Sequence, residues 1–310
     1  LIAATFTPMD ENGNIKLDVI PAYANHIAQY NMTGVFVCGT TGESLSLTIE
    51  ERKAILEKWI EAAKGRFKVI AHVGCNSLFE AMELAKHASL NGADGIGAMA
   101  PCFFKPNTIQ DLIAFFAPIA KSASDLPFYY YNMPSMTGVS LSVVDLLKEG
   151  KKVIPNLVGT KFTHNNLMEM GECLALNQGE FEVLHGYDEI LIAGLSFGAV
   201  AGVGSTYNYI PEIYQGILQA MNNKNLDLAR KLQQKSIEIV RIIIKYGGGV
   251  RGGKAIMNLL GIDCGPCRLP ITSFSTTEYD ALKQASKQAS LKLNKGDLFG
   301  VSASLFKEFL

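Results

Sequence analysis

The chain has 310 residues, of which 48% are hydrophobic and 18% are charged, which is typical of a globular protein with one large α/β domain or two smaller ones. Its formal net charge of −1 and the lack of a basic stripe with interleaved aromatic residues exclude nucleic acid and anionic membranes as expected partners and favour a small molecule. No apolar run reaches the roughly 18 residues of a membrane-spanning helix, and Leu1–Phe6 have neither the basic flank nor the cleavage site of a secretory leader.

Short apolar runs typical of strands alternate with amphipathic, helix-period segments from the first residue to about residue 210. The predicted strands are Ile2–Thr7, Gly34–Cys38, Lys68–Val73, Gly95–Ala100, Phe128–Asn132, Leu157–Phe162, Phe181–His185 and Ala199–Gly202. The helices predicted between them are Val19–Gln29, Ile49–Ala63, Leu78–Leu90, Thr108–Ala123, Val143–Lys148, Asn166–Ala175 and Glu189–Leu195. The run Thr48-Ile49-Glu50-Glu51 has the pattern of a capping box at a helix start.

Eight strand–helix units of this spacing predict an α/β fold, a closed (β/α)8 or TIM barrel. The alternative is an open doubly wound sheet, but its glycine fingerprint is missing after the first strand, where Thr7-Pro8-Met9-Asp10 stands. We therefore expect a catalytic barrel over residues 1–210 and an all-helical C-terminal extension over residues 211–310, which could brace the barrel or form a subunit interface. The helices predicted in this extension are Pro211–Asn222, Leu226–Tyr246, Gly253–Leu260 and Thr277–Leu293, and residues 295–310 receive no assignment.

The six cysteines are scattered along the chain, and several lie in apolar runs typical of buried, reduced thiols. This usage indicates a cytoplasmic protein. Cys264-Gly265-Pro266-Cys267 is a single C-x-x-C without a second pair, so a proline-containing loop is favoured over a zinc or redox site.

Lys161 is the most informative residue, because it lies at the carboxyl end of an apolar run in a predicted buried strand. Burial disfavours the charged form of an amine, so a lysine in such a place can present the neutral amine that attacks a ketone. The ordinary alternative is a lysine that reaches solvent or pairs with a carboxylate. In a (β/α)8 barrel the active site lies at the carboxyl ends of the strands. The residues at the neighbouring strand ends therefore help to decide between a catalytic and an ordinary lysine.

The ends of the second and fifth predicted strands carry hydroxyl groups. Gly39-Thr40-Thr41-Gly42 could form a small cradle of N–H and O–H donors for a carboxylate, although an ordinary glycine-rich turn would have the same composition. On the fifth strand, alternation places Tyr129 and Tyr131 on one face, so that Tyr131 could point its phenol at Lys161 and relay a proton. The alternative for Tyr131 is a core tyrosine.

The ends of the seventh and eighth predicted strands suit a polyhydroxylated ligand. Gly186, Asp188 and Glu189 follow the seventh strand, and carboxylates accept hydrogen bonds from vicinal hydroxyls. Asp and Glu are also frequent in the first turn of a helix, and both interpretations can hold at once. The run 202–207 closes the eighth strand, and its Gly204-Ser205 junction could offer backbone N–H groups.

Two other patterns compete for a function. Residues 248–254 have the spacing of a P-loop, but Ala255 replaces the hydroxyl that would bind magnesium, so nucleotide binding is disfavoured. His72, His164 and His185 fall near strand ends and could in principle bind a metal together with Asp188. They lack the local spacing of a metal motif, which favours histidines held by structural hydrogen bonds.

Four motifs together resemble the pyruvate-dependent class I aldolase family of dihydrodipicolinate synthase and N-acetylneuraminate lyase, nearly over the whole chain. They are the loop 39–43, Tyr131-Asn132-x-Pro134, the run 159–163 and residues 204–207. Within that family, residues 186–189 and 204–209 are similar to the N-acetylneuraminate lyase branch. Met136 stands where dihydrodipicolinate synthases typically carry a carboxylate-binding arginine, which favours an uncharged aldose as the partner.

The resemblance implies reversible cleavage of N-acetylneuraminate to N-acetylmannosamine and pyruvate through an imine on Lys161, with no metal or organic cofactor. It implies that Tyr131 relays protons and that the substrate-binding residues are Thr40, Thr41, Thr163, Gly186, Asp188, Glu189 and Ser205. It also implies a homotetramer. Many relatives carry tyrosines after the fourth strand, which sometimes reach into a neighbouring subunit's site, and Phe103 and Phe104 in this chain argue against such a tyrosine relay across the interface. The alternatives are another keto-acid aldolase or synthase, a metal-dependent aldolase, and a keto-acid-binding barrel without turnover.

Overall fold

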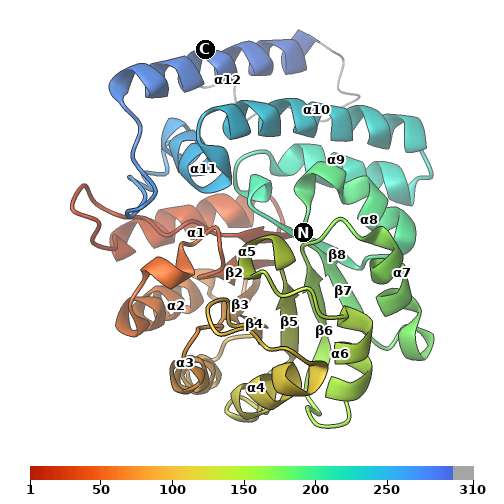
Figure 1. The fold of residues 1–310 in the computed structure, drawn as a ribbon. Coiled ribbons are helices and arrows are strands. Elements are labelled where there is room, and N and C mark those ends of the chain that lie inside the picture. Colours follow the sequence, from red (N-terminus) through yellow and green to blue (C-terminus); the bar gives the residue numbers. More distant parts are fainter. Residues whose placement is uncertain (296–310) are drawn as a thin grey trace.

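Eight parallel strands close into a barrel in the computed structural model, which describes residues 1–295 and their side chains as far as residue 288. Each strand pairs with the next along the chain, and β8 pairs with β1 (Figure 1). The strands are β1 (Ile2–Ala4), β2 (Gly34–Val37), β3 (Lys68–His72), β4 (Gly95–Met99), β5 (Phe128–Asn132), β6 (Leu157–Phe162), β7 (Glu182–His185) and β8 (Ala201–Gly204). The predicted (β/α)8 barrel is confirmed, and the open doubly wound alternative is wrong.

Helices connect successive strands around the outside of the barrel (Figure 1). They are α1 (Ile20–Gln29), α2 (Ile49–Ala63), α3 (Leu78–Leu90), α4 (Ile109–Lys121), α5 (Pro134–Thr137), α6 (Val143–Gly150), α7 (Leu167–Ala175) and α8 (Leu191–Phe197). The predicted capping box at α2 is present: the Thr48 hydroxyl accepts the Glu51 N–H, and the Glu51 carboxylate accepts the Thr48 N–H. Such reciprocal bonds satisfy backbone donors that a helix start otherwise leaves unpaired.

After β8 the described chain is helical, with α9 (Pro211–Asn222), α10 (Leu226–Lys245), α11 (Gly248–Leu259) and α12 (Thr276–Lys295). The long helix α10 lies between α9 and α12 (Figure 1). Within residues 1–295, no helix is both long and apolar enough to cross a membrane. The domain boundary at residue 210 stays a prediction, and residues 296–310 lie outside the described part of the chain.

Most predicted starts agree with the structure to within one residue, but three elements begin further away: α8 begins at Leu191 instead of Glu189, and β8 and α11 are displaced as well. Gly198, at φ +103°, ends α8, and the Ala199 N–H still bonds to the Gly194 carbonyl, so β8 begins at Ala201 instead of Ala199. Helix α11 begins at Gly248 instead of Gly253, because Gly247 makes the left-handed turn that separates it from α10. Packing thus overrides the low helix propensity of the glycines in this segment.

Side chains alternate between the inside and the outside of the barrel, as the two-residue period of a strand requires. The inside holds a small cluster that includes Phe36, Met99, Tyr131 and Leu184. The outward side chains belong to the large core beneath the helices, where Tyr130 packs against Phe116 of α4. Tyr130 and Tyr131 therefore point in opposite directions, as the alternation of this strand requires.

Candidate active site

Lys161 lies on β6 inside the barrel, and its backbone is paired in register with Tyr131 of β5. The side chain is buried, with its Nζ atom 3.9 Å from the centre of the Tyr131 ring and 4.3 Å from that of Phe36. Among the described residues, no carboxylate oxygen lies within 4.0 Å of this Nζ. Neither ordinary alternative, a solvent-exposed or an ion-paired lysine, describes this geometry, and the amine is free to meet a ligand.

Tyr131, whose ring contacts the Lys161 amine, contributes a polar hydroxyl group to the site. This hydroxyl shares a 3.1 Å hydrogen bond with the Thr40 hydroxyl and lies 3.0 Å from the Met133 sulfur. The rings of Phe36 and His72 contact the Tyr131 ring edge to face, which fixes its orientation. Two connected hydroxyls next to an amine can pass a proton between a ligand and the protein.

Thr40 and Thr41 lie in a tight turn after β2. The N–H groups of Gly42 and Ser44 bond to the Gly39 carbonyl, and the Glu43 N–H bonds to the Thr40 carbonyl. Gly39 is required here, because a Cβ atom on it would lie 2.8 Å from the Phe36 ring. Since the turn itself uses the later amides, the cradle predicted from the sequence reduces to the donors of Thr40 and Thr41.

The residues predicted after β7 and β8 meet on the other side of the site. One Asp188 carboxylate oxygen accepts both the N–H and the hydroxyl of Thr206, at 2.9 and 2.6 Å. A Cβ atom on Gly204 would lie 1.7 Å from the other oxygen, so only glycine leaves room for this aspartate. Glu189 and Ser205, the neighbours of these residues in the chain, are half-buried.

Gly186 and Thr163 are also adjacent. A Cβ atom on Gly186 would lie 2.0 Å from the Thr163 hydroxyl, so glycine is needed at this junction too. The Thr163 hydroxyl is buried and has no hydrogen-bond partner among the described residues. A buried hydroxyl without a partner is costly in a folded protein, and a bound ligand would satisfy it.

Asp188 predicts a pH dependence of stability. Burial first, and the nearby Glu189 carboxylate second, raise the pKa of Asp188 from 3.8 to about 6, although the hydrogen bonds from Thr206 and the charge of Lys161 act in the opposite direction. The folded state therefore holds this proton more tightly than the unfolded chain does. Ionisation of Asp188 should therefore lower the free energy of unfolding as the pH rises from 3.8 to about 6. At 1.36 kcal/mol per pKa unit, the decrease is on the order of 3 kcal/mol.

Urea unfolding of the wild type and of Asp188→Asn between pH 4 and pH 7 checks this expectation. Asn cannot lose a proton, so the stability of the variant relative to the wild type should improve as the pH rises to about 6 and then level off. A difference in unfolding free energy that does not change with pH would contradict the buried, proton-binding state of Asp188.

Comparison with known proteins places the chain in a family. The model of the dihydrodipicolinate synthetase family matches residues 1–289. The chain belongs to this family. It is 42% identical over 301 residues to the N-acetylneuraminate lyase of Gallus gallus, covering 96% of this chain and 97% of that protein.

Solved structures agree with this membership. The Proteus mirabilis N-acetylneuraminate lyase has a TM-score of 0.90 and 36% identity, covering 93% of this chain and 97% of that one. A catalytic lysine mutant of the Ruminococcus gnavus sialic acid aldolase also has a TM-score of 0.90, at 27% identity, covering 95% of this chain and 96% of that one. The predicted resemblance to the lyase branch of the family is confirmed.

A pocket of about 200 Å³ adjoins the site at the carboxyl ends of the strands and shares Thr40 with it. Met136 and Thr137 from the β5 side, Met99 and Cys102 from the β4 side, and Val250 and Ile271 from the C-terminal segment contribute to its lining. Met136 is exposed, and it offers no charge to a second carboxylate. The side chain at position 136, where the sequence comparison led us to look for a carboxylate-binding arginine, is therefore an uncharged thioether.

The side chains of His72 and His185 do not come together at one site. His72 lies inside the barrel with its Nδ1 atom 2.9 Å from the Cys38 carbonyl, whereas His185 points outward, against Gly194 of α8. Burial, and then the charges of Arg52 and Lys161, lower the pKa of His72 well below its usual range. Among the side chains that the structure describes, as far as residue 288, no three His, Cys, Asp or Glu are grouped so that they could hold a metal ion.

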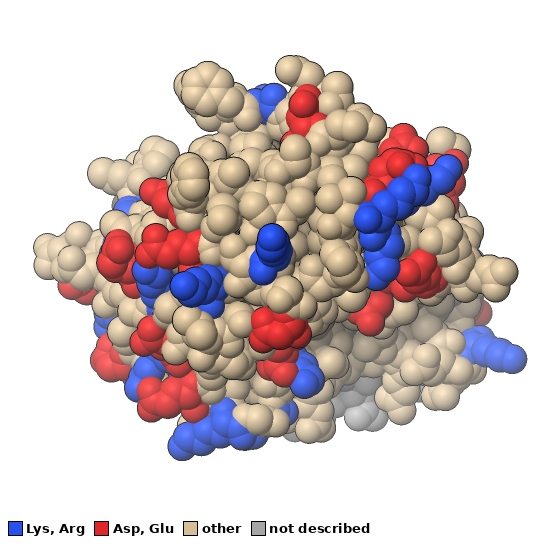
Figure 2. Space-filling view, turned by 90° about the horizontal axis from the view of Figure 1, so that it is seen from below, with Lys and Arg blue, Asp and Glu red and all other residues tan. Residues whose placement is uncertain are grey.

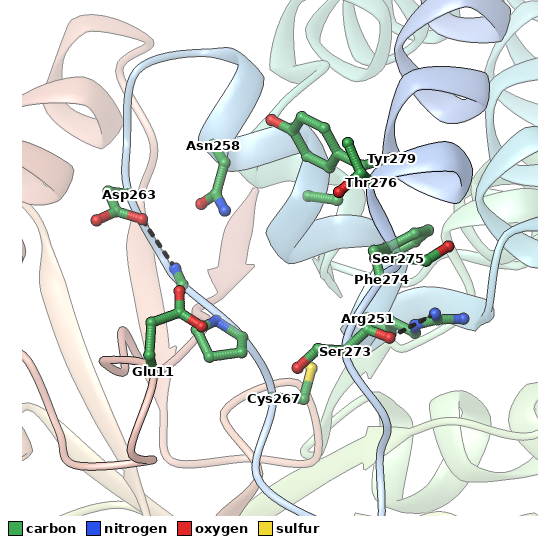
Figure 3. A pocket seen from close by; sticks show the side chains of 13 residues that line it. Glu11, Arg251, Asn258, Asp263, Cys267, Ser273, Phe274, Ser275, Thr276 and Tyr279 are labelled. Atoms are coloured by element: carbon green, nitrogen blue, oxygen red, sulfur yellow. Dashed lines mark hydrogen bonds between the residues drawn. The ribbon is translucent and has the colours of Figure 1, made fainter.

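The segment resembling a P-loop is part of α11. Its lysine, Lys254, is buried and forms an ion pair with Glu43, so it is not available to a phosphate. Arg251 and Cys267 instead line a separate pocket of about 310 Å³ between α11, the start of α12 and Glu11 (Figure 3). The Arg251 guanidinium in this pocket already bonds to the Ser273 carbonyl and the Glu278 carboxylate. None of the predicted site residues lines it.

Phe36 and Met133 are among the site residues that were not predicted. Phe36 and Met133 contact the Lys161 amine and the Tyr131 hydroxyl, respectively. The sequence does place Phe36 on a predicted strand, two residues before Cys38. Alternation alone, however, does not say which of the two apolar faces of that strand points into the barrel. Met133 lies in the turn after β5, where the sequence gives no periodic pattern to follow.

Proposed function

We propose that this chain is a Schiff-base aldolase that reversibly cleaves N-acetylneuraminate into N-acetylmannosamine and pyruvate. The observation that carries the proposal is the Lys161 amine, buried in the barrel without an ion-pair partner among the described residues and in contact with the Tyr131 ring. A nucleophilic amine that is removed from water and placed beside a proton-relaying hydroxyl is what imine chemistry requires. The similarity to N-acetylneuraminate lyases supports the choice of substrate.

In the first half of the reaction, the Lys161 amine adds to the C2 ketone of open-chain N-acetylneuraminate and loses water to give a protonated imine. This cation withdraws electrons, so the C3–C4 bond can break with its electron pair moving into an enamine instead of a free carbanion. Tyr131 accepts the proton of the C4 hydroxyl, directly or through the substrate carboxylate, as the aldehyde of N-acetylmannosamine forms. The Thr40 hydroxyl, 3.1 Å away, is the next group along this path.

In the second half, the enamine takes a proton at C3 and water hydrolyses the imine, which releases pyruvate and restores the amine. Thr40 and Thr41 bind the carboxylate, whereas Thr163, Gly186, Asp188, Glu189 and Ser205 position the sugar chain. This chemistry needs no metal and no organic cofactor. The proposed assembly is a homotetramer, and the exposed Phe103 and Phe104 offer an apolar surface for a subunit contact.

A substrate panel tests the proposal. We expect cleavage of N-acetylneuraminate, insensitive to EDTA, with pyruvate detected by a coupled assay and N-acetylmannosamine by chromatography. Condensation of pyruvate with an aldehyde that carries a carboxylate should be slower by at least about tenfold, because Met136 leaves that charge unpaired. Pyruvate binding without cleavage of any member of the panel would instead indicate a binding protein, and loss of activity in EDTA would indicate a metal-dependent aldolase.

Figure 2 shows one face of the molecule, on which acidic and basic side chains are interspersed. A mixed surface of this kind does not concentrate positive potential as a nucleic-acid-binding face does. It agrees with the small-molecule partner that we propose.

A further inference from the structure

The ion pair between Glu43 and Lys254 joins the catalytic barrel to the C-terminal helices. The Lys254 Nζ atom of α11 lies 2.6 Å from the Glu43 carboxylate, and both side chains are only 1% exposed. Removing two charges from water is expensive, and their attraction offsets this only where the geometry is good and the remaining polar atoms are satisfied. A buried pair of this kind is therefore weak evidence for stability and calls for another explanation.

One short segment supplies a further hydrogen-bond partner to each member of the pair. The second Glu43 oxygen accepts the Arg268 N–H at 2.8 Å, and Lys254 donates to the Pro266 carbonyl at 2.7 Å. The Arg268 guanidinium then bonds to the Ser46 carbonyl and to the Glu51 carboxylate. The segment between α11 and α12, which Figure 1 shows running down toward the loop after β1, thus holds residues 43–51 from outside the barrel.

Glu43 is directly connected to the turn that carries Thr40. Its N–H bonds to the Thr40 carbonyl at 3.0 Å, and its backbone is in the left-handed region, at φ +58°. A residue other than glycine keeps such a conformation only where its surroundings impose it. The buried carboxylate, held by Lys254 and the Arg268 N–H, imposes it here.

We propose that Glu43 and Lys254 are positioning residues, which fix the Gly39–Ser44 turn so that the Thr40 hydroxyl stays within hydrogen-bond distance of Tyr131. The C-terminal helical segment then belongs to the catalytic apparatus, although it touches no reacting atom. This inference rests on the proposed function, because Thr40 matters through the keto acid and the proton path.

The test uses the full chain and four variants: Glu43→Gln, Lys254→Met, the double variant and, as a matched control, Lys16→Met. The control removes the partly exposed ion pair between Lys16 and Asp263, which joins the N-terminal loop to the same C-terminal segment. One measurement is the pyruvate concentration that half-saturates borohydride trapping at Lys161, which counts only folded, competent sites. The other is hydrogen exchange of the peptide covering residues 38–47, with a β5 peptide as reference.

We expect each single variant to raise the half-saturating pyruvate concentration by about tenfold or more, because a small displacement of a positioning group has large effects on productive binding. The double variant should show the same increase as the singles, since all three break one interaction. Exchange in residues 38–47 should accelerate by about tenfold while β5 and the control variant stay within about twofold of the wild type. The double variant leaves no unpaired buried charge, so it remains measurable if a single variant does not fold.

A purely structural pair would lower the melting temperature and leave the half-saturating concentration and the exchange of residues 38–47 unchanged, and this result would overturn the inference. Recovery of both quantities in the double variant would overturn it as well. If the wild type traps no pyruvate at Lys161, the proposed function fails, and the exchange measurement alone decides whether the pair positions the turn.

Discussion

Lys161→Ala should abolish cleavage of N-acetylneuraminate, with a loss in kcat on the order of 10⁴ or more, because the covalent step then has no nucleophile. The amine lies inside the barrel against Phe36 and Tyr131, where no other lysine of the described chain is seen to reach the same position. Removing it also deletes a buried group that has no ion-pair partner among the described residues, so the barrel should remain folded. Circular dichroism and thermal unfolding check that it does.

The same variant decides where the imine forms. Wild-type protein treated with pyruvate and borohydride should gain one stable adduct on the peptide that contains Lys161, and Lys161→Ala should gain none. Lys254 is the other buried lysine that matters here, but its Nζ is held by the Glu43 carboxylate and the Pro266 carbonyl. Mass spectrometry that places the label on Lys254, or finds no label on the wild type, would show that Lys161 is not the Schiff-base residue.

Tyr131→Phe should slow cleavage by about 10² to 10⁴, the range typical of a general acid–base group. The aromatic contacts of the ring to Phe36, His72 and Lys161 do not need the hydroxyl, so imine formation should remain measurable. What the variant loses is the hydroxyl that lies 3.1 Å from Thr40. Rapid-quench measurement of imine formation, compared with steady-state turnover, separates the two steps.

Tyr130→Phe is the matched control for this prediction. Tyr130 is the next residue of β5, but it points outward, against Phe116 of α4. Its variant should keep turnover within about threefold of the wild type, as is typical of a position that does not touch the reacting groups. Equal losses in the two variants would mean that the strand has been disturbed and that Tyr131 has no special role.

Much of the fold could be predicted because its signals are local. The bounds of α2, α3 and α9 agree with the periodic pattern to the residue, and so do those of β5 and β6. The starts of β8 and α11 could not be predicted in the same way. They depend on the left-handed conformations of Gly198 and Gly247, and the sequence does not say which glycines of a cluster adopt them.

In the candidate site, too, some residue pairings could be predicted from local signals and others could not. Tyr131 and Lys161 could be paired in advance, because successive strands of a (β/α)8 barrel are neighbours and the alternation of each strand is fixed. The roles assigned to these and the other site residues stay predictions. Glu43 and Lys254 could not be paired, since they lie 211 positions apart in the chain and neither lies on a periodic face that indicates the other.

By itself, the sequence determined the barrel, its family and the strand ends from which Lys161, Tyr131 and Thr40 project, because periodicity and short motifs are properties of neighbouring residues. Only the tertiary structure decided that the Lys161 amine has no carboxylate beside it among the described residues and that His185 points away from the site. It also decided that the buried Glu43–Lys254 pair ties the C-terminal helices to the Thr40 turn. The physical reason is that burial and ion pairing depend on which distant segments meet, and this is set by the packing of the whole chain.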